Sequence, residues 1–196
     1  MRDLEPADDD RWRLRILGTA DVVELQRFFD ANPEYFLTVQ GEPPRPDEAE
    51  RELADVPPAG MPYREMLLIG FVDDASGDLA GMATIVGDFI ADHVWHIGLF
   101  IVASALHGSG AAHVLYRKLE QWMVDRGARW IRLGVVQGNA KAERFWQRSG
   151  YVQVRERGPL QMGRKTNLLR VMVKPLADST LDAYLALVGR DRIGAE

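Results

Sequence analysis

Residues 99–112 read Leu-Phe-Ile-Val-Ala-Ser-Ala-Leu-His-Gly-Ser-Gly-Ala-Ala, and the interpretation of the whole chain starts from this stretch. An apolar strand pattern runs into a loop that holds Gly108 and Gly110, and a helical pattern follows as far as Gly127. Glycine lets the backbone bend tightly and approach a ligand closely. The first N–H groups of the helix and the positive end of its dipole then face an anion. The pattern predicts either a pyrophosphate site or a plain glycine-rich turn.

Two common pyrophosphate-binding loops fit the sequence poorly. A P-loop needs a Lys followed by Ser or Thr, and neither pair follows Gly110. The dinucleotide fingerprint needs a third glycine where His113 stands and an acidic residue about twenty positions later, and both are missing. A nucleotide-binding oxidoreductase is therefore only a weak alternative.

A second pattern lies downstream, on a predicted helix and the start of the strand after it. Its members are Asn139, Ala142, Phe145, Trp146, Gly150 and Tyr151. Together with His107, Gly110 and Ala112, they resemble the two sequence blocks of the GNAT superfamily of acyl-CoA-dependent N-acyltransferases. Those blocks are Gln/Arg-x-x-Gly-x-Gly/Ala and Asn-x-x-Ala-x-x-Phe/Leu-Tyr-x-x-x-Gly-Phe/Tyr. The resemblance covers residues 95–155; the N-terminal half agrees only in the order of its predicted elements.

The resemblance implies a GNAT fold, an α/β single domain over residues 1–196 with its core at 12–174. We expect a mixed central sheet of about seven strands flanked by helices, with an antiparallel N-terminal half and a splayed parallel pair at the cofactor site. Residues 178–196 are expected to form a C-terminal helix and tail whose docking the sequence leaves open. Hydropathy patterns predict strands at about 12–17, 66–72, 79–86, 93–102, 131–136, 151–155 and 167–173, and helices at 21–31, 47–55, 112–127, 139–149 and 181–188.

The family pattern also implies acetyl-CoA as the acyl donor, held largely by backbone. Splayed strands leave N–H and C=O groups unpaired, and a bound pantetheine chain that pairs with them gains affinity without needing particular side chains. Asn139 would hydrogen-bond the cofactor and can also cap its helix. The implied cofactor-binding residues are Leu99, Phe100, Ile101, Val102, His107, Gly108, Ser109, Gly110, Ala111, Ala112, Asn139, Ala142, Phe145 and Trp146.

Trp146 departs from the family pattern. Many members place there a Tyr that protonates the leaving thiolate, whereas an indole N–H donates a hydrogen bond but is not an acid near neutral pH. A thiol of pKa ~8.5 is a good leaving group without an acid. Trp146 is therefore interpreted either as a catalytic residue that stabilises the thiolate or as a packing aromatic.

The position of the general base departs as well. Many members carry a Glu where this chain has Gly134, and others carry one eleven residues before the Gln/Arg position, which is His96 here. An amine of pKa ~10 must lose a proton before it attacks, and imidazole at ~6.5 is suited to accept it. His96, expected to share a strand face with Gly98 and Phe100, is our hypothesis for the base. The alternatives are a core histidine bonded to a carbonyl, a carboxylate such as Glu65 or Asp88, or ordered water.

Composition excludes several classes of site and partner. There are no cysteines, so disulfides, thiolate metal sites and a Cys nucleophile are absent. His93 and His96 point to opposite faces of a strand, so no metal site is expected. The net charge of -5 argues against nucleic acid, and no apolar run reaches the ~18 residues that span a bilayer. A cytoplasmic protein with no membrane partner is expected, and the family resemblance adds a homodimer as an expectation.

The predicted function is transfer of an acetyl group from acetyl-CoA to a primary amine by direct attack. The acceptor is a small molecule or a peptide, and the sequence leaves a polyamine, an amino acid, an antibiotic, a peptide N-terminus and a lysine open. A non-catalytic acyl-CoA-binding module is the main alternative, because both the usual acid and the usual base are replaced. The proline-rich segment 32–62 is interpreted as the acceptor-specificity region or as a plain surface excursion.

Overall fold

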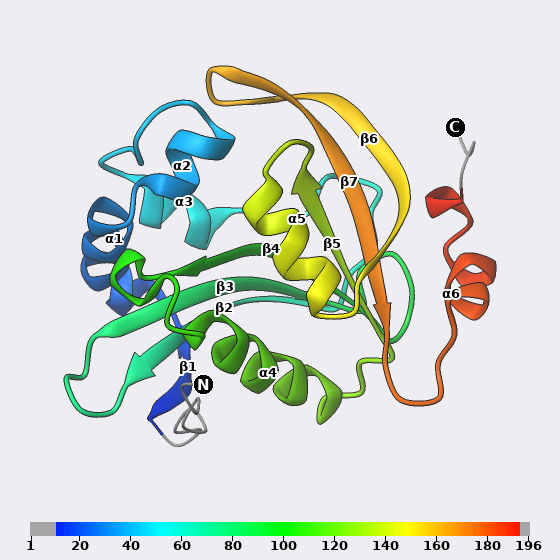
Figure 1. Ribbon diagram of the computed structural model, residues 1–196, viewed down its shortest axis with the longest axis horizontal. Coiled ribbons are helices and arrows are strands. Elements are labelled where there is room, and N and C mark those ends of the chain that lie inside the picture. The colour runs from blue at the N-terminus through cyan, green and yellow to red at the C-terminus, as the bar shows by residue number, and fades with distance from the viewer. Residues whose placement is uncertain (1–10, 193–196) are drawn as a thin grey trace, which may run out of the picture.

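The computed structural model describes residues 11–192, which form one seven-stranded mixed sheet covered by helices on both faces (Figure 1). The strand order is β1-β2-β3-β4-β5-β7-β6. The strands are β1 (Trp12–Leu17), β2 (Glu65–Asp73), β3 (Leu79–Gly87), β4 (Val94–Val102), β5 (Trp130–Val136), β6 (Val152–Met162) and β7 (Lys165–Pro175). The main helices are α1 (Val22–Ala31), α2 (Glu34–Val39), α3 (Glu48–Ala54), α4 (Ala111–Val124), α5 (Ala140–Arg148) and α6 (Leu181–Leu187). The expected fold class is confirmed.

The centre of the sheet holds one parallel pair, β4 and β5. They pair from Val94↔Trp130 to Ile97↔Leu133 and then separate, and Figure 1 shows the two strands diverging beneath α5. Each strand stays with its outer neighbour beyond that point, β4 with β3 as far as Val102 and β5 with β7 as far as Val136. The inner backbone edges of both strands therefore face a gap that no strand fills within residues 11–192.

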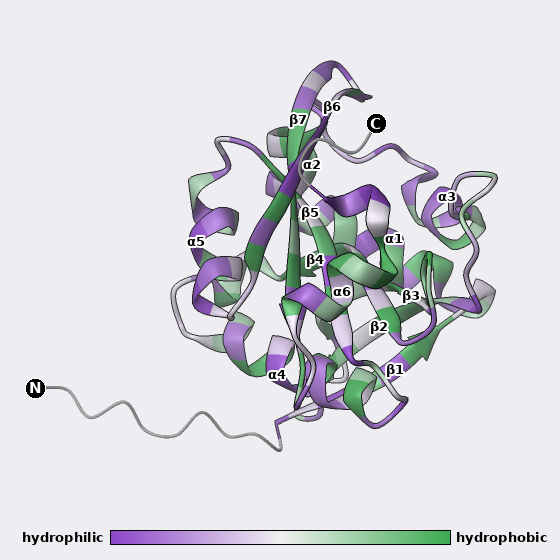
Figure 2. Cartoon of the chain, turned by 90° about the vertical axis from the view of Figure 1, so that its right-hand side faces the viewer, coloured by the Kyte–Doolittle hydropathy of each residue, from purple (hydrophilic) through white to green (hydrophobic). Residues whose placement is uncertain are grey.

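The two faces of the sheet carry different helices. On one face, Leu115 and Leu119 of α4 and Trp146 of α5 pack with Trp95 and Ile97 of β4. On the other face, α1, α2 and α3 pack on β2, β3 and the far end of β4. Figure 2 shows apolar residues concentrated on the strands between these layers, while α5 is largely hydrophilic on its outer side.

The sequence predicted most elements to within two residues but missed two features. Helix α2 lies inside the segment that its prolines marked as irregular, and strand β6 continues to Met162, well beyond its predicted end at 155. Gly158 and Pro159 resemble strand breakers, yet the β6–β7 ladder continues past two register irregularities to the turn at Gly163. The added length carries the β6–β7 hairpin across to α2, where the Asn167 amide donates to the Val39 carbonyl at 2.8 Å.

The docking of the C-terminal helix, which the sequence left open, is settled by a buried cluster. Tyr184 and Val188 pack on Val94 of β4 and Val173 of β7. Asp191, completely buried just beyond α6, accepts from the Arg132 guanidinium of β5 at 2.7 and 3.2 Å. The helix thereby closes the sheet face behind the divergence of β4 and β5. No helix within residues 11–192 has both the length and the hydropathy needed to cross a bilayer.

Candidate active site

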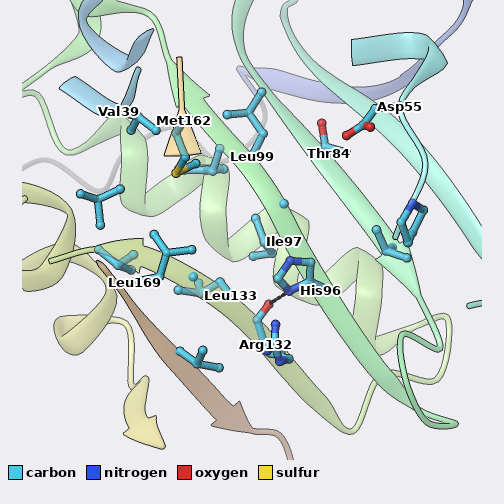
Figure 3. A pocket seen from close by; sticks show the side chains of 18 of the residues that line it. Val39, Asp55, Thr84, His96, Ile97, Leu99, Arg132, Leu133, Met162 and Leu169 are labelled. Carbon is cyan, nitrogen blue, oxygen red and sulfur yellow. Dashed lines mark hydrogen bonds between the residues drawn. The ribbon is translucent and has the colours of Figure 1, made fainter. Parts of the chain in front are cut away.

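The divergence of β4 and β5 opens into a cavity of about 440 Å³. Figure 3 shows its apolar wall, which includes Ile97 and Leu99 of β4, Leu133 of β5 and Leu169 of β7. Its charged groups come from several elements, the carboxylates from α3 and the residue after it and the guanidinium groups from β5 and β6. They are Glu48, Glu52, Asp55, Arg132 and Arg157.

A second cavity of about 250 Å³ adjoins the first along α5. It is bounded by Ile101 and Val102 at the end of β4, by His107 and Ala112, and by Phe145. The two cavities share five lining residues, namely Tyr35, Phe100, Asn139, Ala142 and Trp146. A molecule that occupies the smaller cavity therefore reaches the larger one at the side chain of Trp146.

The loop before α4 borders the smaller cavity, which His107 and Ala112 at the two ends of the loop line directly. Gly108 and Gly110 have φ of +81° and +88°, values that L side chains rarely adopt. Within residues 11–192, the N–H groups of Gly108, Gly110 and Ala112 have no backbone acceptor. These donors stand at the N-terminus of a fourteen-residue helix, so the loop is built to receive an anion.

His107 holds this loop in place through its side chain. Its Nε2 donates to the Val102 carbonyl at 3.0 Å, which leaves Nδ1 to accept from Lys141 Nζ at 3.1 Å. The Lys141 ammonium is thus fixed beside the loop. The sequence did not single out Lys141, because an exposed lysine in the first turn of a helix carries no signal of its own.

The motif residues of α5 line the junction of the cavities. Asn139 caps the helix, its Oδ1 accepting from the Ala142 N–H at 3.2 Å. Trp146 packs edge-on against Phe100, Tyr116 and Tyr151, with ring centroids 5.2–5.6 Å apart. Its indole N–H has no hydrogen-bond partner within residues 11–192 and is not fully covered. Trp146 is therefore a packing aromatic and, at the same time, a free donor at the junction.

His96 lines the larger cavity but not in the orientation that the sequence suggested. The expected face shared with Phe100 is wrong, because a bulge in the β3–β4 ladder at Gly98 reverses the alternation of side chains. Phe100 packs with Tyr116 and Trp146 on the α4 side, whereas His96 stacks on Phe89 at a centroid distance of 4.8 Å. The bulge does leave room at Gly98, where an added Cβ would meet nothing closer than 3.8 Å.

The chemistry of His96 follows from its surroundings. Figure 3 shows its Nδ1 directed at the Arg132 carbonyl, 3.0 Å away. A carbonyl only accepts, so Nδ1 carries the proton and Nε2 keeps a lone pair. Burial, with the nearby Arg132 charge second, lowers the pKa of His96 to about 3. The imidazole is neutral across the physiological range, and it is a weaker base than its residue type suggested.

Glu52 is a site residue that the sequence missed. It comes from α3, its carboxylate accepts from the Thr84 hydroxyl of β3, and both residues line the larger cavity. Burial raises the pKa of Glu52 above its usual value. An acid-rich seven-residue helix is typical of a solvated surface, so nothing in the local pattern placed Glu52 inside. Glu65 and Asp88, the carboxylates considered first, pair with Arg64 and do not line this cavity.

These residues fit acetyl-CoA better than a metal. Unpaired loop N–H groups and Lys141 suit phosphates, and the gap between β4 and β5 suits an extended amide chain. Of the two histidines near β4, His93 contacts the Gly127 carbonyl and His96 the Arg132 carbonyl. Residues 11–192 include no group of three or more His, Asp or Glu side chains positioned to hold a metal ion.

Sequence comparison decides the family. Residues 25–151 match the acetyltransferase (GNAT) family. The chain belongs to this family. Its membership removes the oxidoreductase alternative and makes acetyl transfer the general chemistry of the fold, while no curated protein is significantly similar in sequence.

Solved GNAT structures share the architecture of this chain at low sequence identity. An acetyltransferase from Thermus thermophilus has a TM-score of 0.68 at 19% identity, over 84% of this chain and 97% of that one. A GCN5-related N-acetyltransferase from Kribbella flavida has a TM-score of 0.60 at 24% identity, over 85% and 99%. Spermidine N-acetyltransferase from Vibrio cholerae, solved with CoA and spermine, has a TM-score of 0.60 at 17% identity, over 84% and 95%. At these identities the likeness shows the fold.

Proposed function

We propose that this GNAT protein transfers an acetyl group from acetyl-CoA to a primary amine of a small molecule or a peptide. The observation that carries the proposal is the junction of the two cavities at Phe100, Asn139 and Trp146, where β4 and β5 diverge. One cavity has the anion-binding loop at its end, and the other has carboxylates in its wall. A donor in one cavity and an acceptor in the other meet at this junction. The structural neighbour named as a spermidine N-acetyltransferase supports an amine acceptor.

On the donor side, the loop N–H groups and Lys141 bind the pyrophosphate, and the inner edges of β4 and β5 pair with the pantetheine amides. Bound acetyl-CoA supplies the acetyl group as a thioester. Unpaired backbone groups of β4 beyond Ile97 and the Trp146 indole N–H are the donors available at that point. A fixed donor aimed at developing negative charge stabilises it more effectively than mobile water does.

On the acceptor side, the amine nitrogen bonds to the acetyl carbon, the carbon–sulfur bond breaks, the nitrogen loses a proton and the thiolate gains one. Two groups in the cavity are placed to take the amine proton. His96 offers the lone pair of Nε2, and Glu52 offers a carboxylate whose raised pKa makes it the stronger base of the two. We retain His96 as the proposed base, directly or through one water, and add Glu52 as its competitor.

The experiment that tests the proposal measures thiol release from acetyl-CoA against a broad panel of amines, together with the melting temperature in the presence of CoA, NAD and ATP. CoA and acetyl-CoA should raise the melting temperature, since a ligand at ~100 times its dissociation constant adds about 2.7 kcal/mol. NAD and ATP should not. Stabilisation by CoA without thiol release from any amine would reject the enzyme and support the acyl-CoA-binding module.

A further inference from the structure

Arginine residues gather around Arg132, which lines the larger cavity and whose carbonyl contacts His96. Arg132 and Arg155 place their Nε atoms 2.7 and 3.1 Å from the Asp191 carboxylate, which also accepts from the Tyr184 hydroxyl. Asp191 is fully buried, and these three partners surround it. The one carboxylate at the centre of the cluster is therefore already shared by two guanidinium groups.

Arg157 of β6 belongs to this cluster and lies within reach of the Asp191 charge, but it forms no ion pair within residues 11–192. Within residues 11–192, no carboxylate lies within ion-pair distance of its guanidinium, although Arg155 and Arg170 on neighbouring positions are paired. Burial first, and then the charges of Arg132, Arg190 and Arg155, lower the pKa of Arg157. Partly buried like charges repel, so the cluster is stabilised by any anion that approaches it.

Arg157 also lines the larger cavity. Of the two arginines in the cavity wall, Arg132 is bonded to Asp191 through two of its nitrogens, so Arg157 is the one with its donors available. A guanidinium binds a carboxylate or a related oxyanion through parallel hydrogen bonds, a geometry that no other side chain matches as well.

We propose that Arg157 binds an anionic group of the acceptor, so that the acceptor is a small amino-acid-like molecule with a primary amine and a carboxylate or related oxyanion. This inference rests on the proposed acetyltransferase function. The carboxylates of Glu48, Glu52 and Asp55 also line this cavity, and their negative charge would attract the amine of the acceptor. The same cavity has an apolar wall at Leu133, Met162 and Leu169, which can accommodate a hydrophobic side chain of the acceptor.

A polyamine fits this cavity less well. Its second ammonium would have to lie near Arg157 and the guanidinium groups behind it, where like charges already repel. A peptide acceptor carries its nearest carboxylate at a variable distance from the N-terminal amine, so Arg157 would contribute little that is common to different peptides.

The test compares matched acceptors that differ only in the acid group: a set of hydrophobic amino acids, their carboxamides and the corresponding decarboxylated amines. The free amino acids should have the highest kcat/KM. Arg157→Gln should lower kcat/KM for the amino acids by about 10- to 100-fold, mostly through KM, because hydrogen bonds to charged groups contribute about 1.5–3 kcal/mol. The same variant should lower kcat/KM for the carboxamides much less, because a neutral amide forms a weaker hydrogen bond with Arg157 than a carboxylate does.

Two variants control for charge and folding. Arg157→Lys keeps the charge but loses the forked geometry, so it should recover part of the lost kcat/KM. Arg190→Gln removes a neighbouring charge that does not line the cavity and should change kcat/KM less than about 3-fold. The increase in melting temperature caused by CoA should be the same in the Arg157→Gln, Arg157→Lys and Arg190→Gln variants.

The outcomes separate this inference from the function on which it rests. Thiol release that is no faster with amino acids than with carboxamides, or an Arg157→Gln loss of equal size for both, overturns the anionic subsite and leaves the acetyltransferase intact. Absence of thiol release with every amine, while CoA still raises the melting temperature, overturns the proposed function itself.

Discussion

The two cavities that meet at Trp146 are built in different ways. The proposed donor side is formed by the end of β4, the residues on either side of the glycine loop and α5, with Asn32, Glu34, Tyr35 and Thr38 of the α1–α2 region completing its wall. Its main polar groups are backbone donors of the loop. The acceptor side is assembled from α2, α3, β3, β4, β5, β6 and β7, and its polar groups are side chains, several of them buried. Backbone sites constrain the sequence through glycines and caps at fixed spacing, whereas side-chain sites leave no local pattern.

The comparison also separates the forces that support each side. The donor loop is held by the local contact of His107 with Val102 and by two longer-range hydrogen bonds, that of Lys141 to His107 and that of the Ser104 N–H to Asn32 Oδ1 at 2.6 Å. The acceptor side is held by long-range contacts, among them the Arg132–Asp191 ion pair and the Asn167–Val39 hydrogen bond. Changes on the acceptor side should therefore affect folding as well as activity, and changes on the donor side should affect mainly binding.

The largest effect is expected for Asp191→Asn on the acceptor side. Removal of this fully buried carboxylate leaves Arg132 and Arg155 without a partner, which should destabilise the fold by about 3–5 kcal/mol. Denaturant unfolding checks the value, with Asp182→Asn on the exposed side of α6 as the control. A loss below about 1 kcal/mol would mean that the ion pair does not hold the C-terminal helix.

Gly110→Asp should damage the donor side without unfolding the protein. The new carboxylate would face the bound phosphates, and the φ of +88° strains any L side chain. CoA affinity, measured by calorimetry, should fall by at least about 100-fold, or roughly 2.7 kcal/mol. Gly110→Ala has the same strain but no charge, and its Cβ would meet nothing within 4 Å, so it should lose much less affinity. Normal CoA binding by the Asp variant would mean that the loop is misassigned.

His96→Gln should lower turnover by about 100-fold with CoA affinity unchanged, if His96 is the base. The pKa of His96 is about 3, so the fall in turnover that its protonation causes on the acidic side of the pH–rate profile should lie near pH 3. An ordinary imidazole would place that fall near pH ~6.5. The pH–rate profile could instead fall at a pH closer to neutral. If that fall persists in the His96→Gln variant and disappears in the Glu52→Gln variant, the base is Glu52, whose pKa is raised.

The same lowered pKa predicts how stability depends on pH. A histidine whose pKa is lower in the folded state than in the unfolded state adds stability above about 6.5, and this stability is lost as the pH falls toward 3. Between these two pH values, His96 alone should change the free energy of unfolding by on the order of 1.4 kcal/mol per pH unit. His96→Gln should flatten the dependence, and His93→Gln, on the surface, should not.

The smallest effect is expected at the junction of the two sides. Trp146→Phe removes the free indole donor but keeps the aromatic packing with Phe100 and Tyr116, so turnover should fall by less than about 10-fold. Trp146→Tyr should be tolerated or should be faster, since a phenol can act as an acid. A loss above about 100-fold in the Phe variant, with CoA affinity intact, would make the indole N–H essential.

The amino-acid sequence alone predicted the fold class, which is confirmed, and the loop and helix of the proposed donor side. Helical and strand periods predicted the order of most elements, and the spacing of Gly110, Asn139 and Ala142 identified the loop and the helix that follow the diverging strands. These features are local, because a positive φ or a helix cap depends on residues only a few positions apart.

Only the tertiary structure decided the acceptor side. The bulge at Gly98 turned Phe100 away from His96, and burial against Arg132 lowered the pKa of that histidine. Packing of α3 brought Glu52 into the cavity, and the long β6–β7 hairpin brought Arg157 there. Burial, pairing and charge at these residues depend on contacts between segments far apart in the chain, and such contacts follow from the packing of the whole domain.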